Sequence, residues 1–245
     1  MSEPQYLSLT EISVYSKASR ERLNNPKENF KLVAALIAAI HPREADIAIA
    51  DIGCANGELL YFLRSVFPNA RLTGYDREPK FLEVARSLNL PNTHFEEGDL
   101  REIRPAELFD CVVCLGTVPI FQDPAEVMHP LLSMVKPGGL LLADGLFNRH
   151  ECEVRVSFCD NSTSAGKGLW RIDFAQHSRT RIRTLLEPLC SRVEFHDNEM
   201  GVDIPKRDDR PHVNVWTFKD ESGRRHQTNG LNLLLDDTIV AATRR

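Results

Sequence analysis

Residues 47–58 combine a carboxylate with closely spaced glycines, a pattern that suits binding of a small charged ligand. An apolar run ends at Asp51, and Gly53, Ala55 and Gly57 follow at alternate positions before a helical pattern begins. Residues this small leave little side chain at a turn, so backbone amides and the start of a helix can approach a ligand closely. The pattern predicts a strand, a tight turn and a helix that together hold a small cofactor.

The charge at this turn argues against the common phosphate-binding loops. Walker A loops end in Gly-Lys-Ser/Thr, and the dinucleotide fingerprint needs glycines at its first, third and sixth places. This chain matches neither pattern, because Gly53 and Gly57 are four residues apart and no Lys-Ser/Thr pair follows. A carboxylate at the strand end suits a positive charge, so we expect a cationic ligand rather than a pyrophosphate.

Further segments follow this turn in order, and with it they resemble the motifs of the class I S-adenosylmethionine-dependent methyltransferases. The first motif of that family is acidic-x-Gly-x-Gly-x-Gly, and Ala55 stands here at the central glycine. The later motifs correspond to residues 72–76, 97–100, 109–114 and 135–142. The resemblance covers roughly residues 46–145, and several motifs in the right order and spacing are far more specific than one glycine-rich turn.

The resemblance implies that S-adenosylmethionine is the cofactor and S-adenosylhomocysteine the product, and it assigns the nucleoside to two carboxylates. Asp76 follows the second expected strand and would accept both ribose hydroxyls, with Arg77 beside it. Asp99 would accept from the adenine amine while the Leu100 amide donates to the ring. The alternatives are structural, because aspartate favours turns and also caps helices, one of which could begin near Arg101.

The methionine end of the cofactor is expected at the first motif and at the end of the fourth strand. Asp51 and Gly53 would line it, and Leu115 and Gly116 would present backbone oxygen to the ammonium. Tyr15 lies in a polar N-terminal segment that family members commonly fold over the cofactor; the alternative is a surface tyrosine. The remaining expected cofactor contacts are Cys54, Ala55 and Gly57.

Catalytic residues are harder to identify for this chemistry. Methyl transfer is a direct displacement at an activated carbon, so alignment and water exclusion supply most of the rate. A general base is needed only when the nucleophile carries an acidic proton. The candidates near the strand ends are His150, Asp144 and His129, with His177 farther along. A lone histidine is more often structural than catalytic.

Two motifs of known methyltransferase subfamilies are missing from this chain, and their absence narrows the range of expected substrates. Residues 115–120 lack the Asn/Asp-Pro-Pro-Tyr with which typical DNA amino-methyltransferases grip a planar amine. Asp144 and Gly145 replace the Asp-Asn pair of magnesium-dependent catechol-type enzymes, so we predict no metal. A formal net charge of −5 and a pI near 5.9 give no overall attraction to nucleic acid or to an anionic membrane. A small-molecule substrate is therefore expected.

Composition sets the outer bounds. With 245 residues, of which 42% are hydrophobic, the chain can form one large domain with a sizeable core. No apolar run approaches the ~20 residues needed to span a bilayer, and residues 1–5 lack a secretory core, so we expect a cytoplasmic protein. Cys111 and Cys114 form a C-x-x-C inside an apolar strand, where buried, reduced cysteine is expected rather than a redox or metal site.

Strand and helix patterns alternate along the chain, which predicts an α/β fold with crossover connections. Helices are expected at residues 30–40, 59–66, 79–88 and 179–189. Ser178 should cap the last of these, with Leu189 turned inward. Strands are expected at residues 47–52, 71–75, 93–97, 109–115, 140–144, 193–195 and 238–242. A further helix should begin at Asp123 and be split into two short pieces by Pro130. The resemblance implies a three-layer Rossmann-like fold with a seven-stranded, mostly parallel sheet whose last strand is antiparallel.

We expect a single methyltransferase domain over residues 1–245. Its expected parts are an N-terminal helical cap at residues 1–42, a cofactor-binding core at 43–145, a lid at 146–177 and the rest of the sheet at 178–245. The lid is inferred from a long segment without a regular pattern. Within the last part, a β-ribbon insertion is expected over residues 199–230, with a hairpin across residues 221–223.

Together these features predict an enzyme that transfers a methyl group from S-adenosylmethionine to a small organic acceptor, at oxygen or nitrogen. Two competing interpretations stay open. A protein or RNA methyltransferase would use a docking surface with strong salt dependence, formed by Arg224, Arg225, His226 and a stripe of arginines at residues 179, 181 and 183. The alternative for that stripe is an outward, solvated helix face. A catalytically inactive regulatory protein would bind the cofactor without transferring its methyl group. A nicotinamide enzyme is a more distant alternative, and the chain could form a homodimer.

Overall fold

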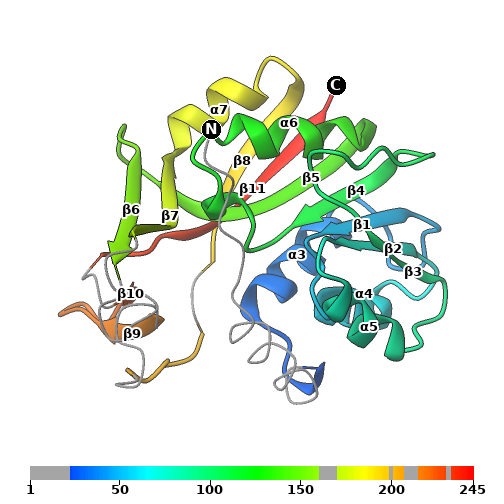
Figure 1. Ribbon diagram of the computed structural model, residues 1–245, viewed down its shortest axis with the longest axis horizontal. Helices are drawn as coiled ribbons and strands as arrows, with labels where there is room; N and C mark the ends of the chain where they lie inside the picture. The colour runs from blue at the N-terminus through cyan, green and yellow to red at the C-terminus, as the bar shows by residue number, and fades with distance from the viewer. Residues whose placement is uncertain (1–22, 160–169, 199–200, 207–214, 230–232) are drawn as a thin grey trace.

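A nine-stranded sheet with helices on both faces forms the centre of the described part of the molecule (Figure 1), beside a separate two-stranded sheet of β9 (Val215–Lys219) and β10 (Arg225–Asn229). The computed structural model describes residues 23–159, 170–198, 201–206, 215–229 and 233–245. Five parallel strands form one side of the sheet: β1 (Ala48–Ile52), β2 (Arg71–Asp76), β3 (Thr93–Glu97), β4 (Phe109–Cys114) and β5 (Val135–Asn148).

The order along the sheet is β3-β2-β1-β4-β5-β11-β8. The final strand, β11 (Asp237–Arg244), runs antiparallel between β5 and β8 (Cys190–Asp197). This confirms the predicted α/β class and the antiparallel last strand. The described sheet is larger than the seven strands expected, because β6 and β7 also join it through β5.

Helices cover both faces of the sheet (Figure 1). One face carries α3 (Glu28–Ala38), α4 (Glu58–Val66) and α5 (Pro79–Ser87), and the other carries α6 (Ala125–Ser133) and α7 (Arg179–Leu186). The two-residue period of the strands divides the core between these layers, so that Ile49 packs with residues of α3 and α4 while Ile52 packs with α6. The apolar spacing in the sequence correctly predicts these helices.

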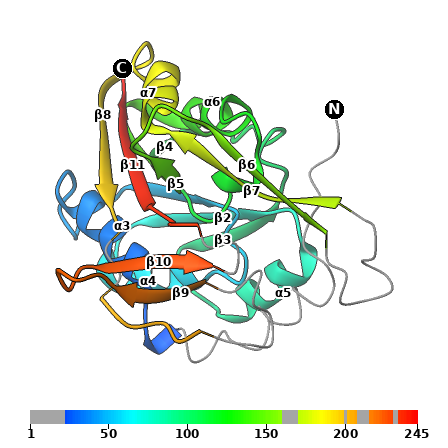
Figure 2. The ribbon, with the colours of Figure 1, turned by 90° about the vertical axis from the view of Figure 1, so that its left-hand side faces the viewer.

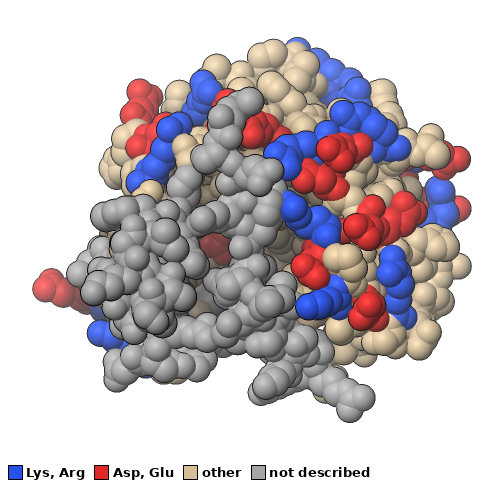
Figure 3. Space-filling view, in the orientation of Figure 1, with Lys and Arg blue, Asp and Glu red and all other residues tan. Residues whose placement is uncertain are grey.

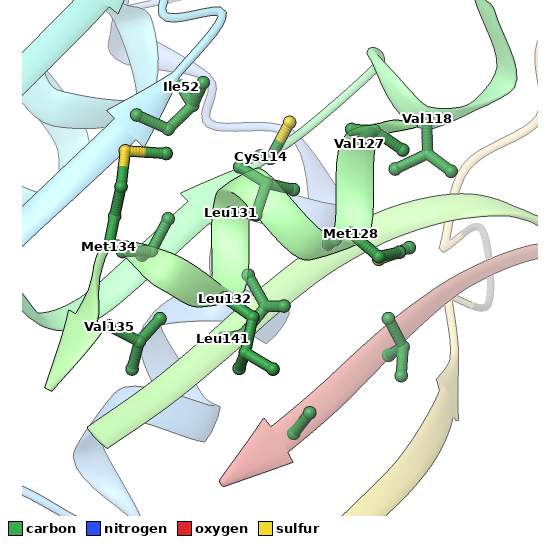
Figure 4. Packing of buried hydrophobic residues seen from close by; sticks show 14 of the residues in the cluster. Ile52, Cys114, Val118, Val127, Met128, Leu131, Leu132, Met134, Val135 and Leu141 are labelled. Carbon is green, nitrogen blue, oxygen red and sulfur yellow. The ribbon is translucent and has the colours of Figure 1, made fainter. Parts of the chain in front are cut away.

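Helix α6 runs through Pro130 as one element, so the predicted split into two pieces is wrong. Proline in a helix interior removes a backbone hydrogen bond and costs about 3 kcal/mol. Met128 before the proline, and Leu131 and Leu132 after it, are buried in the layer that also holds Leu141 of β5 (Figure 4). At about 1.5–3 kcal/mol for each buried side chain, these contacts outweigh the proline.

Residues 146–177 contain a strand pair, so the prediction of an irregular segment is wrong. β6 (Val154–Cys159) pairs antiparallel with β7 (Trp170–Ser178), and the end of β7 pairs in parallel with the end of β5 (Figure 2). Val154 and Val156 alternate with polar residues, which is the two-residue period of a strand. That signal is short, and the scattered aromatic residues obscure it. The Ser/Thr-rich stretch at residues 162–166 lies outside the described residues.

The C-terminal part contains the predicted hairpin. Strands β9 (Val215–Lys219) and β10 (Arg225–Asn229) pair antiparallel and lie in the chain between β8 and β11. Ser178 caps α7 as expected, its Oγ accepting from a backbone amide at 3.1 Å. The helix ends at Leu186, so Leu189 is exposed rather than turned inward as predicted. Among the described residues, no helix is long and apolar enough to cross a membrane.

Candidate active site

Carboxylates from neighbouring strands collect at one edge of the sheet, on the face covered by α3 and α4. Asp51 lies in β1, Asp76 ends β2, Asp144 lies in β5 and Asp237 begins β11. Each is in phase with apolar residues of that face, because side chains along a strand alternate with a period of two. Asp51, Asp76 and Asp144 are 3%, 9% and 7% exposed. Buried acids therefore meet at the strand ends, where open α/β sheets bind ligands.

The turn after β1 leaves room for a ligand to approach the backbone. Gly53, Ala55 and Gly57 all have positive φ, at 79°, 44° and 76°. A Cβ at Gly53 would lie 2.7 Å from Thr117 Oγ1, so both the backbone angle and the space require glycine there. Ala55, at the family's central glycine, adopts its left-handed angle at a cost of about 1–2 kcal/mol. The turn therefore tolerates this departure from the family motif.

Asp76 joins this turn to the end of β2. Its Oδ2 accepts from the Ala55 amide at 2.8 Å, and its Oδ1 accepts from the Glu78 amide at 2.9 Å. Burial raises the pKa of this carboxyl above its usual value, although the hydrogen bonds oppose the shift. A carboxylate has about four acceptor positions, so two remain for hydroxyl groups such as those of a ribose. The turn role and the ligand role are therefore compatible in this side chain.

Asp51 is a buried carboxylate without a partner. In the described part of the chain, its side chain has neither a hydrogen bond nor an ion pair. Burial raises its pKa to about 8, and the negative charges of Asp76 and Asp144 add to the shift while Lys27 opposes it. A carboxylate in such surroundings ionises at neutral pH only when a ligand brings positive charge or hydrogen-bond donors.

Asp144 lies two strands away from Asp51 along the same edge. Its Oδ1 accepts from the Gly116 amide at 2.6 Å, and its Oδ2 lies 3.5 Å from Asn29 Nδ2. Burial and the neighbouring Asp237 raise its pKa to about 7. A carboxyl with this pKa is partly ionised at neutral pH and can take a proton from a bound O–H or N–H group. Asp144 is therefore the candidate base that the structure places among the strand-end acids.

Asp99 is separate from this row and is held by arginine. Its carboxylate accepts from Arg101 Nε at 2.9 Å and Nη2 at 2.7 Å, and Arg77 Nη1 lies 3.8 Å away. The hydrogen bonds from Arg101 lower its pKa to about 2. The Leu100 side chain is buried in the core. Arg101 therefore occupies acceptor positions of Asp99 that an adenine amine would have to share.

The candidate histidines are not brought to the strand-end acids. His129 is exposed on α6, which covers the opposite face of the sheet, and His150 is exposed in the loop after β5. His177 is 2% exposed, and both of its ring nitrogens are hydrogen-bonded within the protein. Of the predicted bases, the structure groups only Asp144 with Asp51 and Asp76. Tyr15 lies outside the described residues.

Three residues near the site are absent from the sequence-based prediction. The positive charge of Lys27 lowers the pKa of both Asp51 and Asp144, and Asn29 contacts Asp144. Asp237, at the start of β11, raises the pKa of Asp144. The sequence does show polar residues at the start of an amphipathic helix, Lys27 and Asn29, and an acid at the start of a strand, Asp237. The sequence did not show which strand ends they would border.

The cysteines near the site are buried thiols. Cys54, Cys111 and Cys114 are free and buried, and burial raises the pKa of each thiol. Thiols with raised pKa values are poor nucleophiles and poor metal ligands at neutral pH. Among the described residues, no group of three or more His, Cys, Asp or Glu side chains could hold a metal ion. These cysteines are therefore core or wall residues.

A largely parallel sheet with β11 antiparallel beside β5, a glycine-rich turn after β1 and acids at the strand ends are typical of the Rossmann-like fold of class I methyltransferases. Residues 49–139 match the family described as methyltransferase domain. This match lies within the part of the chain that carries the motifs, and it confirms their resemblance to S-adenosylmethionine-dependent methyltransferases.

Known proteins agree with this assignment. Trans-aconitate 2-methyltransferase of Escherichia coli is 32% identical over 114 residues, which is 46% of this chain and 44% of the relative. The matched part thus spans less than half the length of that curated relative.

Two solved structures agree over nearly the whole chain. One is the complex between the Haloferax volcanii Trm112 methyltransferase activator and a putative methyltransferase, with a TM-score of 0.60, 15% identity and 97% of each chain covered. The other is SAM-bound CalS10, an amino pentose methyltransferase from Micromonospora echinaspora, with a TM-score of 0.54, 18% identity and 100% of each chain covered. At these identities the likeness shows the fold.

Proposed function

We propose that this protein transfers a methyl group from S-adenosylmethionine to a small organic acceptor, at oxygen or nitrogen, by direct in-line displacement. The observation that carries the proposal is Asp51, a 3%-exposed carboxylate without an ion pair in the described chain, beside a cramped turn and two other buried acids. A cationic cofactor fits this site, because positive charge offsets the cost of ionising a buried carboxylate. A pyrophosphate would increase that cost.

The residues present suit the parts of the cofactor. Asp51 and the turn at Gly53 would hold the methionine end, Asp76 would accept the ribose hydroxyls, and the Leu100 amide would donate to adenine. When bound, the cofactor supplies an activated methyl group. Asp144, with its pKa near 7, would accept the proton of an O–H or N–H nucleophile. Alignment of the acceptor and exclusion of water would contribute up to about 7–11 kcal/mol.

Titration calorimetry with S-adenosylmethionine tests the binding site. Asp51→Asn keeps the shape of the side chain and removes its charge, so the affinity should fall by about tenfold or more, which is at least about 1.4 kcal/mol. Asp46→Asn is the matched control, because Asp46 is 74% exposed and pairs with Arg71 at the surface. Its affinity should stay unchanged. An absence of heat with both S-adenosylmethionine and S-adenosylhomocysteine would refute the proposal.

The chemical class of the methyl acceptor can be tested by following radiolabel from S-adenosylmethionine into a fractionated extract. We expect label in small molecules. Figure 3 shows Lys and Arg interspersed with Asp and Glu over the visible described surface, and Arg225 of β10 is paired with Asp203. This mixed charge favours a small acceptor over RNA. Label in protein or RNA would support a macromolecular substrate, and binding without any transfer would support a regulatory protein.

We also propose that the chain forms one methyltransferase domain, acts in the cytoplasm and assembles as a homodimer. All six cysteines are free thiols, which suits a reducing compartment. Cell fractionation tests the location, and sedimentation analysis tests the assembly. A monomer at micromolar concentration would contradict the dimer.

A further inference from the structure

His177 links two parts of the molecule that are far apart in the chain. Its side chain lies in β7 and is 2% exposed. Its Nδ1 lies 2.8 Å from Glu153 Oε2, just before β6, and its Nε2 lies 3.0 Å from the carbonyl oxygen of Phe121. Phe121 follows the short helix η1 (Val118–Ile120), in the connection between β4 and α6. We call these two hydrogen bonds the His177 clasp.

Both partners of the ring are hydrogen-bond acceptors. The Phe121 carbonyl cannot donate, and Glu153 is held as a carboxylate, since hydrogen bonds from Ser178 and His177 keep its pKa below the usual value although burial opposes this. A neutral imidazole carries only one N–H. Both bonds of the clasp can therefore form only when both ring nitrogens carry a proton.

The connection held by the clasp borders the candidate active site. Thr117 lies against the turn after β1, because a Cβ on Gly53 would come within 2.7 Å of Thr117 Oγ1. The Gly116 amide donates to Asp144 at 2.6 Å. β7 itself packs against η1. A shift of η1 would therefore move a wall that the cofactor turn and Asp144 share.

We propose that His177 is a positioning residue for the methyl transfer proposed above, and that it acts only while its ring is doubly protonated. The inference rests on that proposed function, and His177 acts through the backbone of Phe121 rather than on the reacting atoms. When the ring loses one proton, the remaining N–H stays on Glu153, because a hydrogen bond to a charged acceptor is stronger. The Phe121 oxygen then faces a nitrogen lone pair, and η1 is released.

Most of the other charged side chains on the surrounding elements have hydrogen-bond or ion-pair partners other than the His177 ring. The surrounding elements carry charged or titratable side chains at Asp123, Arg149, His150, Arg155, Arg179 and Arg181. Arg181 pairs with Asp123, and Arg149 and Arg179 pair with Asp197. Arg155 donates to the Gln122 carbonyl. In the described part of the chain, Glu153 is the charged group that bonds the ring, so it controls the proton requirement.

The variant Glu153→Gln can keep both hydrogen bonds of the His177 clasp while changing the number of ring protons that they need. Glu153 Oε1 now accepts from the Ser178 amide at 2.7 Å, and the glutamine oxygen can take over that bond. The glutamine nitrogen would donate to Nδ1 of a neutral ring, which leaves Nε2–H for Phe121. The clasp in this variant therefore needs one ring proton instead of two.

Nitrogen-15 NMR of the histidine rings tests the protonation of His177 in protein that holds neither cofactor nor methyl-accepting substrate. Both His177 nitrogens should carry protons in the wild-type protein, and only Nε2 should do so in Glu153→Gln. Glu151→Gln is the matched control, because Glu151 is an exposed acid in the same loop, and it should keep both protons. A neutral ring in the wild-type protein would overturn the inference.

The positioning role is tested by the rate of label transfer from S-adenosylmethionine to the extract fraction that accepts it. Between about pH 6 and about pH 9, the ratio of the Glu153→Gln rate to the wild-type rate should rise by about tenfold, the effect of one lost hydrogen bond. The ratio cancels the pH dependence of the chemistry. A constant ratio would overturn the positioning role. If no form transfers label while the wild-type ring is doubly protonated, the proposed function fails and the clasp stands.

Discussion

Buried aspartates give the candidate site its electrostatic character. Burial raises the pKa of Asp51 to about 8, and burial and Asp237 raise that of Asp144 to about 7. By contrast, hydrogen bonds from Arg101 lower the pKa of Asp99 to about 2 at a more exposed position. Proton uptake is thus concentrated at the strand ends, and strongly perturbed pKa values of this kind are typical of functional sites.

The free energy of unfolding of the cofactor-free protein should fall as the pH rises from about 5 to about 8. In this window the folded protein keeps protons on Asp51 and Asp144 that the unfolded chain, with aspartate pKa values of 3.8, has released. Stability decreases with pH wherever the folded state binds more protons. Asp51→Asn should flatten the dependence, because each pKa unit is worth about 1.4 kcal/mol. Urea denaturation over a pH series measures this, and stability rising over the window would contradict it.

Among the secondary-structure elements, α6 shows tertiary packing overriding local preference. Its interior Pro130 disfavours a continuous helix, yet the helix continues and Leu131 and Leu132, which follow the proline, are buried. The element is therefore stable because of the sheet beneath it (Figure 4). The same reasoning applies to β6 and β7, whose weak strand pattern is completed by pairing with each other and with β5.

Pro130→Ala should raise the free energy of unfolding by up to about 3 kcal/mol, because alanine restores a backbone hydrogen bond and removes a steric clash. Its effect on S-adenosylmethionine affinity should be negligible, since α6 covers the face opposite the strand-end acids. Pro188→Ala, after the end of α7, is the control and should change stability little. Urea denaturation measures both variants. Equal stability of Pro130→Ala and wild type would show that the helix has already relaxed around the proline.

Across the whole molecule, Arg179 holds the far part of the sheet together. It donates to the Phe147 carbonyl at 3.1 Å and to Thr238 Oγ1 at 3.2 Å, and it pairs with Asp197. These partners lie in β5, β11 and β8. The side chain is 20% exposed, so the prediction that it belongs to an outward, solvated arginine stripe is wrong. Its fixed fork of donors suits three acceptors at once.

Arg179→Ala should lower the free energy of unfolding by about 2–3 kcal/mol, because it removes hydrogen bonds to three partly buried acceptors on three strands. Arg181→Ala is the control on the same helix. Arg181 is 48% exposed and pairs with Asp123 at the surface, so its loss should cost less than about 1 kcal/mol. Thermal and urea denaturation measure the two variants. Similar losses would mean that the links of Arg179 contribute no more than a surface ion pair.

Most of the fold, together with the Gly53 turn and the positions of Asp51 and Asp76, follows from local patterns in the chain. Apolar period, turn residues and caps specify strand β1, the positive-φ turn at Gly53 and the Ser178 cap, because each depends on interactions within a few residues. These patterns, in their order, also carry the resemblance to S-adenosylmethionine-dependent methyltransferases. They are sufficient to predict Asp51 and Asp76 at adjoining strand ends, since parallel strands present those ends at one edge.

Contacts between distant segments could be decided only by the folded chain. Nothing near Asp237 in the sequence indicates that it lies beside Asp144, and nothing near His177 indicates two acceptors on opposite sides of its ring. Pairing of strands across the sheet brings these groups together, and burial then sets their charge. The tolerance of Pro130 has the same origin, because the free energy that offsets it comes from residues on other strands.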